Sequence, residues 1–186
     1  MKEIEILIEV KSTKEEALNV LSHFESKGVK ETLDVYFNDP LRNDLQPGEN
    51  NRLLNSFRLR QKAGKNYLAY KVDHFDGEEW SHSDEYETGV ADLDVMIAVI
   101  EKLGLVEMVR IDNFKHTFIT PDYEIVLEDV KDLGLFMEVE KLAQVSDEEV
   151  LSAKEEIRTF LKTLNIDFGE EQNAGKPELM LRKNKK

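Results

Sequence analysis

The sequence contains no cysteine among its 186 residues. Disulfide bonds and thiolate chemistry are therefore excluded, and we expect a protein of a reducing compartment, the cytoplasm. No apolar run reaches the roughly 18 residues that a membrane-spanning helix needs, so we expect no membrane association. The opening segment, MKEIEILIEV, alternates charged and apolar residues, which differs from the continuous apolar stretch of a secretory signal peptide.

Positive charge is scarce. Lysine and arginine number 25 against 39 aspartates and glutamates, which gives a formal net charge of −14. A broad basic surface for nucleic acid is therefore excluded, and we expect no nucleic-acid partner. A pocket that gathers a few cations can still bind phosphate, because low-dielectric walls focus their field.

Several common catalytic motifs are also missing. The four histidines show no HExxH or other paired ligand spacing, and no GxSxG motif is present. Gly64 and Lys65 lack the upstream glycine of a phosphate-binding P-loop. The sequence therefore does not predict a zinc protease, an α/β-hydrolase or a P-loop enzyme.

Paired charges at every second residue are the most informative feature that is present. Successive side chains of a strand point to opposite faces, so both charges of such a pair lie on one face. If these strands belong to one curved sheet, their charges converge on a concave surface that suits a polyanion and its metal ion. The four stretches are Glu3-Ile4-Glu5, Arg58-Leu59-Arg60, Glu85-Tyr86-Glu87 and Glu138-Val139-Glu140.

The pattern of apolar and turn residues predicts an α+β fold in a single domain over 1–186. Antiparallel pairing is favoured because helices are too few for a parallel sheet. We expect an eight-stranded, mostly antiparallel, closed β-barrel with about three flanking helices. The predicted strands are 3–10, 31–37, 55–61, 67–73, about 80–88, 107–119, 123–130 and 135–142. The predicted helices run from Ser12 or Thr13 towards a C-cap at Gly28, over 91–103, and from Ser146 to about Leu164.

Two segments are predicted to be irregular. The polar stretch from Asn38 to Asn51 is either a mobile lid or a disordered excursion. The tail after Gly169 is polar and ends in Leu179-Met180-Leu181 followed by a basic run, and this run is predicted to be a frayed terminus.

The order and spacing of several short motifs resemble the CYTH superfamily, the triphosphate tunnel metalloenzymes. That group includes class IV adenylate cyclases, thiamine triphosphatases and inorganic triphosphatases. The resemblance covers roughly residues 3–180. It rests on Glu3-Ile4-Glu5, Ser56-Phe57-Arg58-Leu59-Arg60, Leu68-Ala69-Tyr70-Lys71, Glu85-Tyr86-Glu87, Lys115-His116-Thr117-Phe118 and the segment from Leu127 to Glu140.

The resemblance implies a tunnel that binds a small triphosphate such as ATP, thiamine triphosphate or tripolyphosphate. Arginine and lysine bind phosphate oxygens, and glutamates supply the hard oxygen ligands of Mg²⁺ or Mn²⁺. The implied phosphate-binding residues are Arg58, Arg60, Lys71 and Lys115. The implied metal ligands are Glu3, Glu5, Glu138 and Glu140. Further residues that join the metal or orient the lysines are Glu85, Glu87 and Glu128.

The chain departs from the family pattern where Leu7, Ser83 and Asn113 replace expected cations. A second register, with Glu9-Val10-Lys11 as the Glu-x-Lys element, is open but keeps fewer glutamates. Three functions follow from the resemblance: hydrolysis of a triphosphate, cyclisation of ATP, or binding without turnover. A monomer and a homodimer are both open. Residues that could compensate for the missing cations are Lys11, Arg52, Lys176 and Arg182.

Overall fold

The computed structural model describes residues 2–77 and 79–184, which form one curled antiparallel sheet and four α-helices. The helices are α1 (Lys14–Leu21), α2 (Leu93–Lys102), α3 (Val150–Thr163) and α4 (Lys176–Asn184). The strands are β1 (Lys2–Glu3), β2 (Glu5–Val10), β3 (Glu25–Asn38), β4 (Asn55–Lys62), β5 (Lys65–Asp76), β6 (Glu79–Val90), β7 (Val106–Ile119), β8 (Tyr123–Val130), β9 (Gly134–Lys141) and β10 (Phe168–Gln172).

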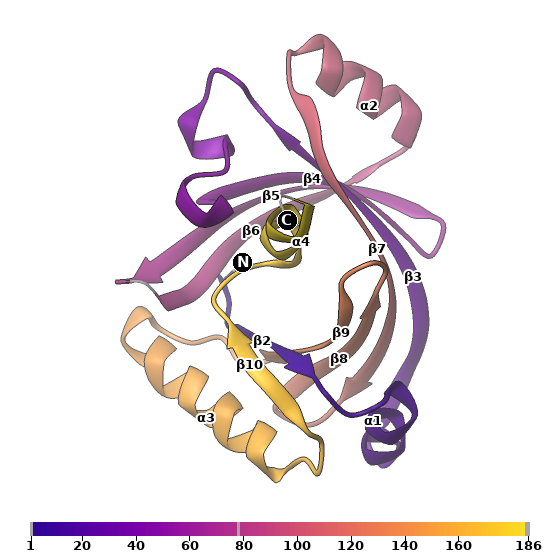
Figure 1. Ribbon diagram of the computed structural model, residues 1–186, viewed down its shortest axis with the longest axis vertical. Coiled ribbons are helices and arrows are strands. Elements are labelled where there is room, and N and C mark those ends of the chain that lie inside the picture. The colour runs from indigo at the N-terminus through magenta and orange to yellow at the C-terminus, as the bar shows by residue number, and fades with distance from the viewer. Residues whose placement is uncertain (1, 78, 185–186) are drawn as a thin grey trace.

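The strand order is β1-β6-β5-β4-β3-β7-β8-β9-β2-β10. Ile4 alone separates β1 from β2, yet β1 pairs with β6 and β2 pairs with β9. The N-terminal segment therefore reaches both sides of a sheet that curls around its own concave face (Figure 1). The predicted α+β fold with a mostly antiparallel sheet is confirmed, but the described residues form ten strands and four α-helices where eight strands and about three helices were predicted. Only two residue pairs join β1 to β6, and complete closure of the barrel stays a prediction.

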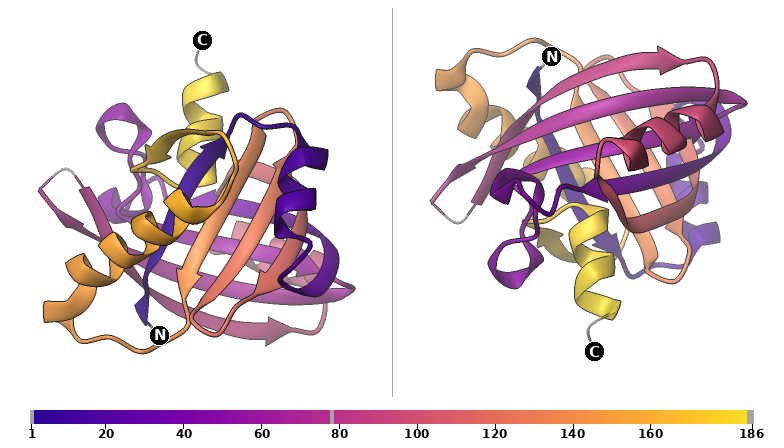
Figure 2. Two further views of the ribbon diagram at one scale, coloured as in Figure 1. Left: turned by 90° about the horizontal axis from the view of Figure 1, so that it is seen from below. Right: turned by 90° about the horizontal axis from the view of Figure 1, so that it is seen from above.

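Three helices cover the convex outer face of the sheet. Apolar residues of α1 and α3, such as Leu21 and Ile157, pack against the outward residues of β2, β8 and β9. On the other side Ile100 of α2 packs against Leu59 of β4 and Val35 of β3. The views in Figure 2 show these helices on the outside of the strands. Among the described residues, no helix is both long and apolar enough to cross a membrane.

Local signals mark the start of one helix and the end of another as predicted. Thr13 forms a capping box with Glu16 at the start of α1, and Gly104 has φ +93 just after α2. The prediction that Gly28 ends the first helix is wrong, because α1 ends at Leu21. Gly28, with φ +87, instead lies at a register shift where β3 pairs with β7. Cross-strand pairing therefore decides the conformation of this segment.

The polar tail forms regular structure, and the predicted fraying of the basic run is wrong for its described part, since Arg182 and Lys183 lie in a helix. Residues Phe168–Gln172 form β10, which pairs with β2, and Lys176–Asn184 form α4. Figure 1 shows α4 within the curl of the sheet, whereas the other helices lie outside it. Met180 of α4 is buried against Leu7, Tyr36 and other apolar residues at this end of the lumen. Figure 2 shows α4 at one end of the curled sheet, where it projects beyond the strands, and its first residues, among them Lys176, line the cavity.

The segment between β3 and β4 contains two short 3₁₀ turns, Asn43–Leu45 and Glu49–Asn51. Leu45 is 3% exposed and Asn51 is 5% exposed, so this segment packs on the rest of the protein at both turns. The segment was predicted to be either a mobile lid or a disordered excursion, and the two packed turns do not fit a disordered excursion.

Candidate functional site

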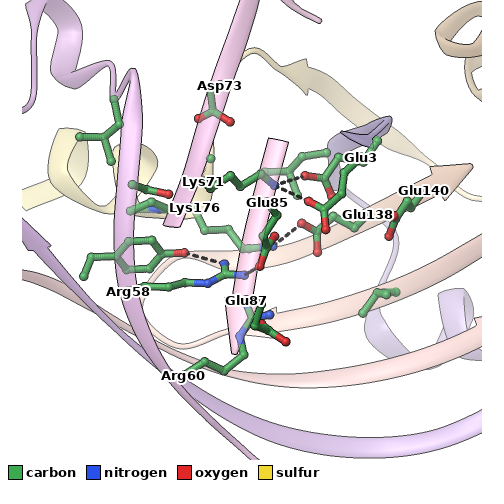
Figure 3. A pocket seen from close by; sticks show the side chains of 18 of the residues that line it. Glu3, Arg58, Arg60, Lys71, Asp73, Glu85, Glu87, Glu138, Glu140 and Lys176 are labelled. Atoms are coloured by element: carbon green, nitrogen blue, oxygen red, sulfur yellow. Dashed lines mark hydrogen bonds and ion pairs between the residues drawn. The ribbon is translucent and has the colours of Figure 1, made fainter. Parts of the chain in front are cut away.

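A cavity of about 510 Å³ lies on the concave face of the sheet (Figure 3). Strand alternation sends charged side chains into it while the apolar residues between them face outward to the helices. The predicted site residues that line the cavity are Glu3, Glu5, Arg58, Arg60, Lys71, Glu85, Glu87, Lys115, Glu138 and Glu140. Glu128 is not among the lining residues and lies fully buried beneath Lys115.

The two arginines of β4 are held by an acid of the neighbouring strand β3 and by an acid of β6, which lies one strand beyond β5. Arg60 donates two hydrogen bonds to Asp34 of β3, at 2.7 Å and 2.8 Å. Arg58 donates to Glu85 of β6 at 2.9 Å and to the Tyr36 hydroxyl at 3.2 Å. Burial alone would raise the pKa of Asp34, but both guanidinium groups outweigh it and keep that pKa well below its usual range. The arginines therefore stand in fixed positions, fully charged.

Lys71 of β5 bridges to the N-terminal strand pair. Its Nζ atom donates to Glu5 at 2.8 Å and lies 3.0 Å from Glu3. The Trp80 ring lies 5.4 Å from the same ammonium. This lysine thus links two of the predicted metal ligands to the phosphate-binding side of the cavity.

Two lysines and two glutamates form a compact cluster at the base of the cavity. Lys115 of β7 lies 2.5 Å from Glu128 and 3.5 Å from Glu138. Lys176 of α4 lies 2.9 Å from Glu128 and 2.8 Å from Glu138. Burial would raise the pKa of Glu138, but Lys176 and then Lys115 outweigh it and hold that pKa well below its usual value. Four charges therefore neutralise one another where water is scarce.

One wall of the cavity carries more carboxylates than its lysines neutralise. Burial raises the pKa of Glu140 to about 8, and repulsion from Glu5, Glu3 and Glu124 adds to it. Burial also raises the pKa of Glu3 to about 7, although Lys71 opposes the shift. Such shifts arise where carboxylates share a site without enough positive charge.

The charge balance of the whole cavity leads to the same conclusion. Among the described lining residues, nine are acidic and six are basic. A triphosphate carries several negative charges, so this cavity binds one favourably only if further cations enter with it. Carboxylate oxygens are the ligands that Mg²⁺ and Mn²⁺ prefer. The lining residues Glu3, Glu5, Glu138 and Glu140 therefore fit a divalent metal by their chemistry.

The three uncharged replacements each have a structural reason. Leu7 packs in the apolar cluster that contains Met180, at the end of the lumen that α4 occupies. Ser83 donates to Asp73 at 2.5 Å, and Asn113 donates to buried Glu128 at 3.1 Å. Leu7 therefore contributes to apolar packing, and Ser83 and Asn113 contribute hydrogen bonds, where the family pattern expects a cation.

The structure also distinguishes between the predicted compensating cations. Lys176 enters the cavity, whereas Lys11, Arg52 and Arg182 are not among its described lining residues. Lys11 lies 2.6 Å from Glu9, outside the cavity. The lining residues Glu3, Glu5 and Leu7 follow the first register, and neither Glu9 nor Lys11 joins them among the described residues.

Sequence reasoning missed several charged residues of the site. Asp34 is the cross-strand partner of Arg60, and its place inside the otherwise apolar run from Leu33 to Phe37 was the available signal. Asp73 lies two residues after Lys71, so strand alternation could have found it. Glu178 of α4 accepts the Leu53 backbone N–H at 2.8 Å and lines the cavity, but the polar tail gave no sign of burial.

Known proteins show the same architecture. The PH1819 protein from Pyrococcus horikoshii superposes with a TM-score of 0.81 at 22% identity, covering 97% of this chain and 99% of that one. A protein from Hippeastrum, "Putative adenylyl cyclase HpAC1", superposes with a TM-score of 0.65 at 17% identity, covering 100% of this chain and 96% of that one. Its structure is described as revealing a dominant triphosphatase activity. At these identities the likeness shows the fold.

Sequence comparison adds the family. "Putative adenylate cyclase MJ0240" from Methanocaldococcus jannaschii is 28% identical over 169 residues, which cover 89% of this chain and 91% of that protein. The sequence profile of the CYTH domain matches residues 1–171. The chain therefore belongs to the CYTH domain family.

Proposed function

We propose that this protein is a metal-dependent hydrolase of an organic or inorganic triphosphate. The observation that carries the proposal is one cavity in which basic residues of three strands and of α4 face a carboxylate wall (Figure 3). Membership of the CYTH family supports triphosphate processing in general. Family membership does not specify the reaction or the substrate, so hydrolysis of a triphosphate is proposed from the cavity.

Phosphate binding falls to Arg58, Arg60, Lys71 and Lys115, with Lys176 as a fifth cation. Each arginine presents a planar fork that matches two phosphate oxygens, and each lysine acts as a point charge. The two arginines are paired with acids, Arg58 with Glu85 of the lumen and Arg60 with buried Asp34. Substrate phosphates therefore enter a site whose donors are already oriented, and this lowers the entropic cost of binding.

The carboxylate wall supplies the metal site. Glu3, Glu5, Glu138 and Glu140 would hold a Mg²⁺ or Mn²⁺ ion, while Glu85, Glu87 and Glu128 orient Arg58 and the lysines. When bound, the metal neutralises phosphate oxygens and the charge that develops on them. The lumen residues hold the chain of phosphates in line and exclude bulk water. In the reaction, a water oxygen bonds to the terminal phosphorus, the bridging P–O bond breaks, and orthophosphate leaves.

Cyclisation of ATP is the second candidate, because the relative from Methanocaldococcus jannaschii carries the name of an adenylate cyclase. The same cations would hold the triphosphate, but a ribose hydroxyl would attack the α-phosphorus and pyrophosphate would leave. Binding without turnover is a third candidate. It is favoured by Leu7, Ser83 and Asn113, which carry no charge where the family pattern expects a cation.

One assay separates the three candidates. The purified protein is incubated with ATP, thiamine triphosphate or tripolyphosphate, each with Mg²⁺, with Mn²⁺ or with a chelator. Metal-dependent release of orthophosphate is expected. Cyclic AMP with pyrophosphate would replace the hydrolase by the cyclase. The absence of turnover, with metal-dependent thermal stabilisation by tripolyphosphate, would leave a binding protein.

A variant pair connects the activity to the cavity. Arg58→Ala removes a lumen guanidinium, and Arg110→Ala removes one that pairs with Glu107 on the exposed surface of β7. A charged hydrogen bond is worth about 1.5–3 kcal/mol, so Arg58→Ala should weaken tripolyphosphate binding by roughly 10-fold to 150-fold. Arg110→Ala should bind as the wild type does. Equal binding by both variants would remove Arg58 from the site.

A further inference from the structure

Two histidines and an aspartate lie together on the outer face of the β5–β6 hairpin, away from the cavity. His74 and His82 are direct cross-strand partners, and Asp84 follows two residues after His82 on the same face. One donor atom from each of these residues lies within 4.8 Å of the others. Their strand neighbours Lys71, Asp73 and Glu85 point the other way, into the lumen.

The three side chains are already arranged around a common point. The imidazole rings of His74 and His82 stack with centroids 4.5 Å apart and an interplanar angle of 10°. The Nε2 atom of His74 lies 2.9 Å from Asp84 Oδ2. Tetrahedral coordination at about 2.0–2.2 Å places neighbouring ligand atoms roughly 3.4 Å apart, so small side-chain rotations suffice to complete a site.

The backbone explains why the group forms at this point. The register of β5 and β6 shifts directly after His74, since His74 pairs with His82 but Phe75 pairs with Trp80. Ser81 is the extra residue of this bulge, and bulges re-aim the side chains beside them. The Ser81 hydroxyl lies 3.0 Å from His82 Nδ1. A contact of this kind fixes the orientation of an imidazole that binds metal through its other nitrogen.

We propose that His74, His82 and Asp84 form a binding site for a divalent transition-metal ion of the zinc class. Two imidazoles and one carboxylate suit Zn²⁺, with water at the remaining position, whereas Mg²⁺ prefers oxygen ligands alone. The side chains of His74 and Asp84 are 42% and 38% exposed, so an ion reaches them from solvent. The site is distinct from the carboxylate wall in position and in ligand type.

A metal at this position links the two strands that carry part of the lumen. β5 provides Lys71 and β6 provides Glu85 on the opposite face of the same hairpin. Because binding to the folded state alone stabilises it, the ion should raise the temperature of unfolding. The proposal does not depend on which reaction takes place in the cavity.

The test is a calorimetric titration of the whole protein with Zn²⁺ in excess Mg²⁺. The Mg²⁺ occupies oxygen sites but competes poorly for imidazole. One Zn²⁺ equivalent is expected to bind, and the Co²⁺ form should show absorption bands of nitrogen and oxygen coordination. His74→Ala and His82→Ala should each lose this binding. Ser81→Ala should weaken it by about 10-fold to 100-fold.

Two matched variants serve as controls. His116→Ala removes an imidazole from β7, and Glu140→Gln removes a carboxylate from the tunnel wall; both should keep the Zn²⁺ site. Circular dichroism without metal verifies that each variant is folded, and a Zn²⁺-dependent rise in unfolding temperature should be absent from His74→Ala. Unchanged Zn²⁺ binding in His74→Ala and His82→Ala, or loss of binding in His116→Ala or Glu140→Gln, would overturn the proposal.

Discussion

Replacement of Lys176 by glutamine tests the buried cluster that joins α4 to the sheet. Lys176 is 6% exposed and forms ion pairs with Glu128 and Glu138. Among the described ion pairs, these two glutamates have one other lysine partner, Lys115. Lys176→Gln leaves fully buried Glu128 and half-buried Glu138 to share one lysine. Breaking a buried ion pair from one side costs about 3–5 kcal/mol. For a chain of this length, roughly 2–4 °C per kcal/mol predicts a fall of roughly 6–20 °C in the unfolding temperature.

The loss should depend on pH in a defined direction. Without Lys176, the pKa of Glu128 rises further above its ordinary value, because burial and Glu138 already raise it and Lys176 is one of the two lysines that oppose them. The folded variant then retains a proton that the unfolded chain releases above the ordinary glutamate pKa. Stability falls with rising pH wherever the folded state holds more protons. The difference between variant and wild type should therefore be larger at pH 8 than at pH 5.

Thermal unfolding followed by circular dichroism at both pH values measures this effect. Lys183→Gln on the same helix is the control, since its exposed ammonium contacts only the Asp132 carbonyl among the described hydrogen bonds. It should change stability by about 0.5 kcal/mol or less. If Lys176→Gln unfolded at the same temperature as Lys183→Gln at both pH values, the reasoning about the buried cluster would be refuted.

Two further predictions concern the metal wall and the apolar end of the lumen. The pKa is raised to about 8 for Glu140 and to about 7 for Glu3, so between pH 5 and 8 the folded protein holds protons that the unfolded chain has released. The free energy of unfolding without metal should therefore fall as pH rises through this range, by at most about 1.4 kcal/mol per pH unit for each group. Mg²⁺ binds the ionised form, so it should raise the unfolding temperature more at pH 8 than at pH 5; an equal rise at both values would argue against a carboxylate metal site. Met180→Ala removes a buried side chain that packs on Leu7 and should cost about 2–5 kcal/mol in urea unfolding, whereas exposed Leu151→Ala should cost under about 0.5. Equal midpoints for these two variants would mean that α4 does not pack inside the curl.

The sequence predicted the sheet because strand alternation is a local property. Each charged pair, such as Arg58 with Arg60, reports which face of its own strand is polar. The cavity inverts the usual arrangement, since its polar face is enclosed and its apolar face meets helices. The family resemblance supplied the assumption that the polar faces meet, and strand order and cross-strand pairing then brought these residues together.

The C-terminal region could not be predicted from local pattern. Lys176 and Glu178 are polar residues in a polar segment, and such segments are usually solvated. Here they are buried because the lumen offers ion-pair and backbone partners that lie far away in the sequence, such as Glu138 and the Leu53 N–H. The prediction that Gly28 ends a helix was wrong for a similar reason, because the partner strand β7 decides the conformation of this glycine. The His74–His82 pair was also invisible, since it depends on the hairpin register.

The central claim is that a triphosphate and a divalent metal bind together inside the curled sheet. A crystal of the protein with tripolyphosphate and Mn²⁺, measured at a wavelength where manganese scatters anomalously, tests it directly. We expect a manganese peak beside Glu138 and Glu140, with phosphate oxygens in hydrogen-bond contact with Arg58, Arg60 and Lys71. Manganese and tripolyphosphate bound only on the outer surface, with the lumen unchanged, would contradict it.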